Sequence, residues 1–292
     1  MSERNVTAAD GRTLRISEVG DPSGTPILWL HGTPGSRLSD SVVAAHAQDK
    51  RLRLIGYDRP GYGGSSRHSA RNVADCASDV RAIATALGIE RLAVWGVSGG
   101  GPHAAACAAL LEGIVPAVAV LASPAPYGAP KLDWLAGMGE LNVQEVELQL
   151  KDPDAARARC VEDRRELLDA DLAGVLDSWR SLFSPVDVAA LTPEFGASMI
   201  AQMKEGLQGS EEGWWDDSVA HLGDWGFGLT QIRTPVLVVH GRQDQFVPFS
   251  HGQWLAEAIP TAEPMLLEDE GHISLITNRL DEIEDWLLAR MG

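Results

Sequence analysis

Short runs of apolar, β-type residues alternate with helical stretches at both ends of this chain of 292 residues. Most of the runs are continuous rather than alternating in polarity, which is typical of strands buried on both faces of a sheet. We expect strands at residues 14–19, 26–30, 53–57, 92–95, 115–122, 235–239 and 265–267, and helices at residues 73–87, 99–111, 251–258 and 273–288. Because strands that alternate with helices form parallel sheets, this pattern predicts an α/β fold with a mostly parallel, doubly wound sheet of about eight strands.

The stretch between these two regions has a different pattern. Residues 125–232 show helical periodicity and no strand pattern, and they carry most of the net charge of −17 and most of the tryptophans (Trp134, Trp179, Trp214, Trp215 and Trp225). A helical insertion in an α/β chain is expected to cover the carboxyl edge of the sheet, where open α/β sheets bind ligands. We therefore expect an α/β core made of residues 1–124 and 233–292, with residues 125–232 as an inserted helical cap.

Composition and charge exclude several classes of protein. With 45% hydrophobic and 22% charged residues the chain resembles an ordinary globular protein rather than a disordered one. The net charge of −17 argues against nucleic acid and anionic membranes as partners. The polar segment 1–12 lacks a signal-peptide core, and the cysteines and histidines have no disulfide or metal-ligand spacing. We expect a cytoplasmic protein without metal or cofactor, and the sequence leaves its oligomeric state open.

The strand expected at residues 92–95 runs directly into Trp95-Gly96-Val97-Ser98-Gly99-Gly100-Gly101. The glycines around Ser98 permit a sharp, strained turn, and the serine hydroxyl would project from it at the N-terminus of a helix. This G-x-S-x-G pattern is typical of a nucleophile elbow. A glycine-rich turn with an incidental serine is the alternative. A phosphate-binding loop is disfavoured, because no Lys-Ser/Thr pair follows.

Three further segments favour the nucleophile. The loop after the strand at residues 26–30 contains His-Gly-Thr-Pro-Gly, which places the backbone N–H of Thr33 where a second oxyanion donor would join that of Gly99. Asp244 follows the strand at residues 235–239, and His272 follows the last strand. In this order His272 would be the general base for Ser98, and Asp244 would orient its ring. Asp269 and Glu270 are alternative partners for His272, because they are close to it in the sequence.

At this point the chain resembles α/β-hydrolase fold proteins, over roughly residues 5–124 and 233–290. Residues 57–65 are similar to the D-x-x-G-x-G-x-S segment of these proteins, and we expect Asp58 and Arg59 to pair locally there. The His-Gly-x-Pro-Gly loop is also similar to that of prolyl iminopeptidases. Those enzymes usually have glycine in place of Thr33 and tryptophan after the nucleophile, where this chain has Gly99. Haloalkane dehalogenases and epoxide hydrolases resemble the fold too, but their nucleophile is an aspartate and not a serine such as Ser98.

The leading prediction for function is a serine hydrolase that cleaves a small or medium carboxylic ester through an acyl-enzyme. An aminopeptidase, a lactonase and a hydrolase of carbon–carbon bonds would use the same three side chains and stay open as alternatives, as does a ligand-binding protein without turnover. The candidates for lining the substrate pocket are His103, Trp214 and Trp215. The acidic cap would suit a cationic substrate, although a solvated helix surface explains the same charge.

Overall fold

The computed structural model describes residues 1–292 and contains one sheet of eight strands in the order β1-β2-β4-β3-β5-β6-β7-β8. β2 is antiparallel to both of its neighbours, β1 and β4, and every other neighbouring pair is parallel. The expected α/β fold with a mostly parallel sheet is therefore confirmed. The strands are β1 (Ser2–Thr7), β2 (Thr13–Gly20), β3 (Thr25–Leu30), β4 (Leu52–Tyr57), β5 (Ala93–Val97), β6 (Val118–Leu121), β7 (Val236–Gly241) and β8 (Ala262–Leu267).

The sequence pattern does not predict two of the elements, β1 and α1 (Ser41–Asp49). In β1 the only buried residue is Val6, so the strand has no apolar run, and its backbone pairs with β2 along its whole length. In α1 the buried residues are Val43 and Ala47 alone, and Asp40 caps the helix by accepting a hydrogen bond from the backbone N–H of Val43. Both elements depend on tertiary pairing more than on a local pattern.

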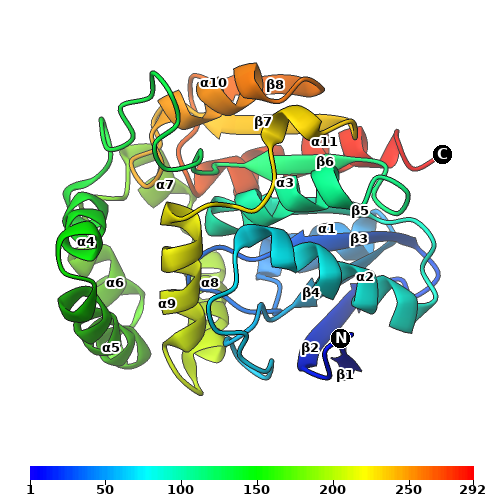
Figure 1. Cartoon of the computed structure of the whole chain (residues 1–292), viewed down its shortest axis with the longest axis horizontal. Coiled ribbons are helices and arrows are strands. Elements are labelled where there is room, and N and C mark those ends of the chain that lie inside the picture. Colours follow the sequence, from blue (N-terminus) through cyan, green and yellow to red (C-terminus); the bar gives the residue numbers. More distant parts are fainter.

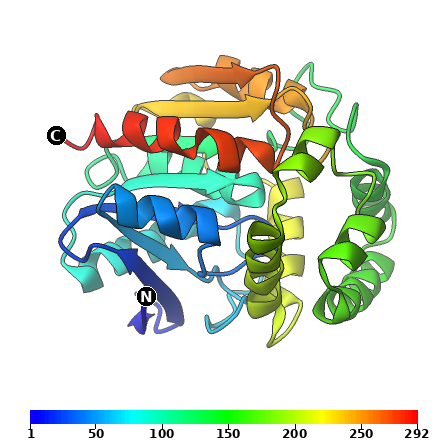
Figure 2. The ribbon, with the colours of Figure 1, turned by 180° about the vertical axis from the view of Figure 1, so that it is seen from behind.

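Helices cover both faces of the sheet (Figures 1 and 2). On the face seen in Figure 1, α2 (Cys76–Leu87), α3 (Gly101–Leu110) and α10 (Phe249–Ala258) pack against the larger apolar core. On the opposite face, seen in Figure 2, α1 and α11 (Ser274–Leu288) pack against a second core. Because α3 is rich in alanine, it packs closely on β5 and β6 beneath it.

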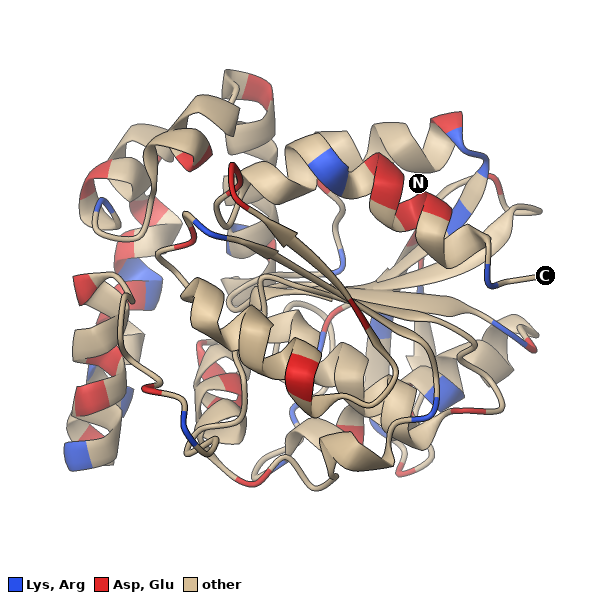
Figure 3. Ribbon diagram, turned by 90° about the horizontal axis from the view of Figure 1, so that it is seen from above, with Lys and Arg blue, Asp and Glu red and all other residues tan.

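The chain between β6 and β7 is helical and contains no strand. It forms α4 (Glu140–Lys151), α5 (Pro153–Asp169), α6 (Leu172–Ser178), α7 (Pro185–Ala190), α8 (Pro193–Leu207) and α9 (Glu212–Leu222) at one end of the sheet, on the left of Figure 1. Acidic and basic residues are interspersed along these helices (Figure 3).

Three 3₁₀ turns complete the structure, at Val73–Asp75, Ser98–Gly100 and Leu229–Gln231. None of the helices in the chain combines the length and apolar character needed to cross a membrane.

Candidate active site

Ser98 occupies the tight turn between β5 and α3. Its φ of +54° lies in the left-handed region, which is strained for a residue with a side chain. The neighbouring glycines are required for space, because a Cβ at Gly96 would collide with the carbonyl oxygen of Gly100, and one at Gly100 would collide with that of Leu30. The turn therefore has the strand–turn–helix geometry expected for a G-x-S-x-G nucleophile.

The loop of residues 31–35, which follows β3, lies directly beside this turn. A Cβ on Gly32 would stand 3.6 Å from the Cβ of Ser98, and a Cβ on Gly99 would collide with the side-chain oxygen of Thr33. Thr33 and Gly99 are therefore adjacent in space, although they are far apart in the sequence. We call residues 31–35 the oxyanion loop, because it contains the second backbone donor expected from the sequence.

Asp244 lies in the turn after β7 and is fully buried. One carboxylate oxygen accepts the backbone N–H groups of Phe246 and Val247 at 2.9 and 2.8 Å, and the other accepts Nδ1–H of His272 at 2.8 Å. Burial opposes ionisation of Asp244, but the attraction of His272 and hydrogen bonds from His240 and His272 outweigh it and hold the pKa of Asp244 at about 2. Burial likewise opposes the charged form of His272, but Asp244 raises its pKa above the ordinary value.

The alternative partners for His272 are engaged elsewhere. Glu270 accepts hydrogen bonds from Ser274, Asn278 and Arg279, and the exposed Asp269 pairs with the same arginine at 3.5 Å. The alternative in which Asp269 or Glu270 orients His272 is therefore wrong for this structure.

A pocket opens in front of Ser98 and is lined by His272 as well. Its walls are mostly apolar and aromatic. They come from β3 and β5, from the loops after β3 and β7, from the start of α11, and from the segment between β6 and β7: Trp29, Pro34, Trp95, Val97, Trp179, Phe183, Phe195, Met199, Met203, Phe246, Ile273 and Ile276. The polar side chains in the lining, besides those of Ser98 and His272, belong to Thr33, Asp40 and Gln202. Phe246 stacks on the ring of His272, with 4.5 Å between ring centroids.

The three residues proposed from the sequence as pocket-lining lie outside this pocket, so that prediction was wrong. His103 is buried in α3, with Nδ1 2.9 Å from the carbonyl oxygen of Gly99. Trp214 and Trp215 are turned toward α5, where Trp215 packs against the guanidinium of Arg157. The buried residues of α9 are Gly213, Asp216, Asp217 and Ala220, so its buried face is not its apolar one and its orientation could not be predicted from apolar periodicity.

The residues that do line the pocket had weak signals in the sequence. Trp29 and Trp95 lie near the carboxyl ends of β3 and β5, where ligands of open α/β sheets are found, and could have been identified by that rule. No comparable signal marks Trp179, Phe183 or Met203, because their positions depend on how the helices pack.

Asp58 and Arg59 do not pair with each other, contrary to our expectation. Asp58 accepts hydrogen bonds from the backbone and the guanidinium of Arg37 and from the backbone of Gly64. Arg59 instead pairs with Asp217 of α9 at 2.6 Å. Successive residues at the end of a strand point to opposite faces, so the two side chains diverge.

Known proteins resemble this chain in both sequence and fold. Residues 25–279 match the family model described as alpha/beta hydrolase fold, and the chain belongs to that family. The AB hydrolase superfamily protein YisY of Bacillus subtilis (strain 168) is 27% identical over 263 residues, covering 89% of this chain and 88% of that protein. A proline iminopeptidase of Xylella fastidiosa (strain 9a5c) is 36% identical over 102 residues, 34% of this chain and 32% of that protein. The solved esterase RhEst1 from Rhodococcus sp. ECU1013 has a TM-score of 0.72 at 23% identity, covering 99% of this chain and all of that one.

Proposed function

We propose that this chain is a serine hydrolase that cleaves small or medium carboxylic esters. The observation that carries the proposal is that Ser98 and His272 line one apolar pocket, while His272 is hydrogen-bonded to the buried carboxylate of Asp244. A nucleophile, a base and a group that orients the base are the minimum that acyl transfer to a serine requires.

In the first half of the reaction, Oγ of Ser98 attacks the ester carbonyl while Nε2 of His272 takes its proton. Nε2 is the free nitrogen, because Nδ1 is committed to Asp244. The negative charge that develops on the carbonyl oxygen is stabilised by the backbone N–H groups of Thr33 and Gly99. His272 then returns the proton to the leaving alkoxide, which departs as the alcohol.

In the second half, water attacks the acyl group on Ser98 and His272 acts as base again. The carboxylic acid leaves and the serine is regenerated. No cofactor enters either half-reaction. The charge of Asp244, held ionised by its pKa of about 2, stabilises the imidazolium form of His272 in both halves.

An ester is favoured as substrate because the pocket offers a mostly apolar surface. Burial of an acyl chain against side chains such as Phe183 and Met203 supplies binding energy of about 25 cal/mol per Å². RhEst1, whose fold this chain shares, is described as an esterase. A lactone or a substrate with an activated carbon–carbon bond would meet the same catalytic groups.

One observation favours an aminopeptidase as the second candidate. Asp40, the only acidic residue in the pocket lining, could pair with a substrate ammonium group. Burial raises the pKa of its carboxyl group, so the ammonium group itself would have to hold the carboxylate ionised. The partial similarity to a proline iminopeptidase is consistent with this activity. The carboxylate would then come from the segment before α1 and not from the helical insertion, where the sequence had suggested one.

The test is hydrolysis of p-nitrophenyl esters of increasing acyl length beside amino-acid p-nitroanilides, with Ser98→Ala as control. An esterase gives ester turnover with a chain-length optimum that the variant lacks. Turnover of the anilides alone, lost in Asp40→Asn, would establish the aminopeptidase instead. If neither substrate class is hydrolysed, labelling of Ser98 by a fluorophosphonate would indicate a working nucleophile with a different substrate. No labelling of the folded protein would contradict the proposal and favour a ligand-binding role.

A further inference from the structure

The helical segment between β6 and β7 contributes a buried charge to the underside of the oxyanion loop. The carboxylate of Asp217, on α9, is completely inaccessible to solvent. One of its oxygens accepts hydrogen bonds from Thr33 Oγ1 at 2.9 Å and from the hydroxyl of Tyr62 at 2.8 Å. It is also paired with the guanidinium groups of Arg59 and Arg71, each at 2.6 Å. Burial opposes ionisation here, but the two arginines outweigh it and lower the pKa of Asp217 well below its usual range.

Arg59 transmits this anchor to the backbone of the oxyanion loop. Its guanidinium donates to the carbonyl oxygens of His31 and Gly32, the latter at 3.0 Å, and to the hydroxyl of Thr33 at 3.1 Å. The carbonyl of Gly32 and the N–H of Thr33 belong to the same planar peptide group. Fixing that carbonyl therefore fixes the direction in which the Thr33 N–H points.

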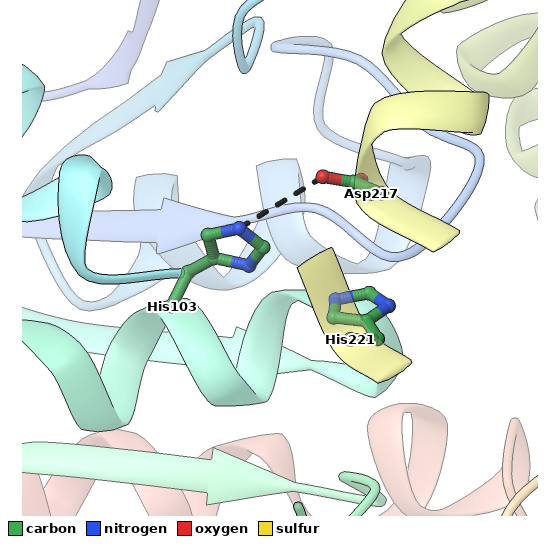
Figure 4. A group of neighbouring side chains, drawn as sticks. All are labelled: His103, Asp217 and His221. Carbon is green, nitrogen blue, oxygen red and sulfur yellow. Dashed lines mark ion pairs between the residues drawn. The ribbon is translucent and has the colours of Figure 1, made fainter. Parts of the chain in front are cut away.

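The other donor, Gly99, is held from the same helix. His221 lies one turn after Asp217 on α9, and its Nε2 is 3.0 Å from the carbonyl oxygen of Gly99. Nδ1 of His103 reaches the same oxygen from α3 at 2.9 Å. The side chains of His103, Asp217 and His221 lie close together between α3 and α9 (Figure 4). Burial lowers the pKa of both imidazoles, that of His221 to about 4, so each ring is neutral and donates one N–H to the carbonyl.

Coordination of a metal ion does not explain this cluster, although ligand atoms of His103, Asp217 and His221 lie within 4.8 Å of one another. Asp217 already neutralises one of two buried guanidinium groups, so the surroundings are positive and disfavour a further cation. Two of the three side chains instead share a single acceptor, the Gly99 carbonyl, which lies beside the nucleophile.

We propose that Asp217 and His221, here called the α9 pair, are positioning residues for the oxyanion hole. Asp217 orients the Thr33 donor through the hydroxyl of Thr33 and through Arg59, and His221 fixes the peptide that follows the Gly99 donor. The last helix of the inserted segment is thus part of the machinery that stabilises the transition state. This inference rests on the proposed hydrolase function.

The test separates positioning from simple attachment of α9 to the core. His221→Phe keeps the ring shape but loses the N–H, whereas His221→Gln retains an amide donor in the place of Nε2. Thr33→Val and Thr33→Ser form the same kind of pair for the contact with Asp217. Asp216→Asn is the matched control, because Asp216 also joins α9 to the core, through two 2.8 Å hydrogen bonds from Arg67, and does not touch the oxyanion loop.

Kinetics of p-nitrophenyl ester hydrolysis provide the readout. Complete removal of an oxyanion donor lowers kcat about 10²–10³-fold, so displacement of one by His221→Phe or Thr33→Val should lower kcat roughly tenfold with KM within about twofold. His221→Gln and Thr33→Ser should recover most of the loss, and Asp216→Asn should keep kcat within about twofold of wild type. Affinity for a trifluoromethyl ketone, which forms the oxyanion, should fall in parallel with kcat/KM.

Two outcomes would overturn the inference. One is unchanged kcat in folded His221→Phe and Thr33→Val, and the other is an equal loss of kcat in those variants and in Asp216→Asn. If wild type hydrolyses no ester, the ester assignment fails on its own, and the same variants are compared by the rate at which a fluorophosphonate labels Ser98. That reaction also develops charge in the oxyanion hole. Equal labelling rates in wild type, His221→Phe and Thr33→Val, or no labelling of wild type, would contradict the positioning role of the α9 pair.

Discussion

The two sides of the oxyanion loop differ in chemistry more than in depth of burial. On one side is the pocket in front of Ser98, whose walls are aromatic rings, methionines and branched aliphatic side chains. On the other side, Asp217, Arg59 and Arg71 form a cluster of almost fully buried charges. A loop of five residues thus separates a mostly apolar pocket from a dense set of ion pairs.

The difference shows how a flexible type of segment is held in a fixed geometry. The backbone carbonyls of a loop lack the hydrogen bonds that a helix or a sheet would provide. The planar guanidinium of Arg59 donates hydrogen bonds to two of these carbonyls. The charge of that group needs a partner in the interior, which Asp217 provides. On the apolar side, pocket-lining side chains such as Phe183 and Met203 are held by packing in an apolar cluster.

The largest effect should come from the pocket side and should leave the stability unchanged. Ser98→Ala removes the nucleophile, and we expect kcat/KM for esters to fall at least about 10³-fold. The free energy of unfolding, measured by urea denaturation, should stay within about 0.5 kcal/mol, because the side chain lines the pocket and supports no buried contact. A folded variant with more than a tenth of the wild-type rate would remove Ser98 from the mechanism.

On the charged side we expect a substitution to lower the stability of the fold. Arg59→Met leaves Asp217 with one guanidinium partner fewer and removes the guanidinium that donates to the carbonyls of His31 and Gly32. The free energy of unfolding should fall by about 3–5 kcal/mol in the urea experiment. The side chain of Arg67 is 36% exposed and pairs with Asp216 and Glu212, so Arg67→Met should cost no more than about 1 kcal/mol. Similar losses in the two variants would mean that the buried cluster contributes nothing special.

The pH dependence of kcat/KM should reflect the titration of His272 on the pocket side and of no histidine on the charged side. Protonated His272 cannot accept the serine proton, so kcat/KM should fall tenfold per pH unit below its pKa, which Asp244 raises above about 6.5. The histidines on the charged side remain neutral, because burial lowers the pKa of His103 and brings that of His221 to about 4. A slope of one in log kcat/KM between about pH 5 and 6.5 checks this. A slope of two would show that a second group titrates.

The smallest effect should be a change of preference within the pocket. Phe183→Ala enlarges the apolar wall, so longer p-nitrophenyl esters should gain relative to shorter ones, by roughly tenfold in the ratio of kcat/KM values. Trp215→Ala changes an aromatic residue of the same segment that faces Arg157 instead, and the preference should be unchanged. An equal shift in both variants would mean that the pocket does not select the acyl group.

The sheet and the positions of Ser98, Asp244 and His272 could be predicted from the sequence because they follow strand ends. The parallel strands place their carboxyl ends at one edge, so residues distant in the chain converge there without further information. The glycines around Ser98 marked the turn in the same way, since each one is required by backbone contacts that any such turn makes.

The arrangement of the helical segment between β6 and β7 could not be predicted in the same way. Its sequence shows where apolar residues recur, but not which neighbouring element each side chain contacts. Trp214 and Trp215 were plausible in the pocket and lie against α5, while Asp217 and His221, on the same helix, face the oxyanion loop. Asp217 among many acids of this segment looks like surface charge, and its partner Arg59 is 158 residues away. Such pairings depend on the final packing and leave no local pattern.

The ion pairs that attach α9 to the core limit how much of the helical insertion can be exchanged between related proteins. Replacing residues 125–232 as one block would remove Asp217 and leave Arg59 and Arg71 as uncompensated cations inside the fold. A graft that stops before α9 would carry Trp179, Phe183 and Met203 of the pocket wall and would leave the buried pairs of Asp217 with Arg59 and Arg71 intact. The part of the insertion that can be exchanged between related proteins therefore ends before α9. The helix α9 has to stay with the core whose charges it neutralises.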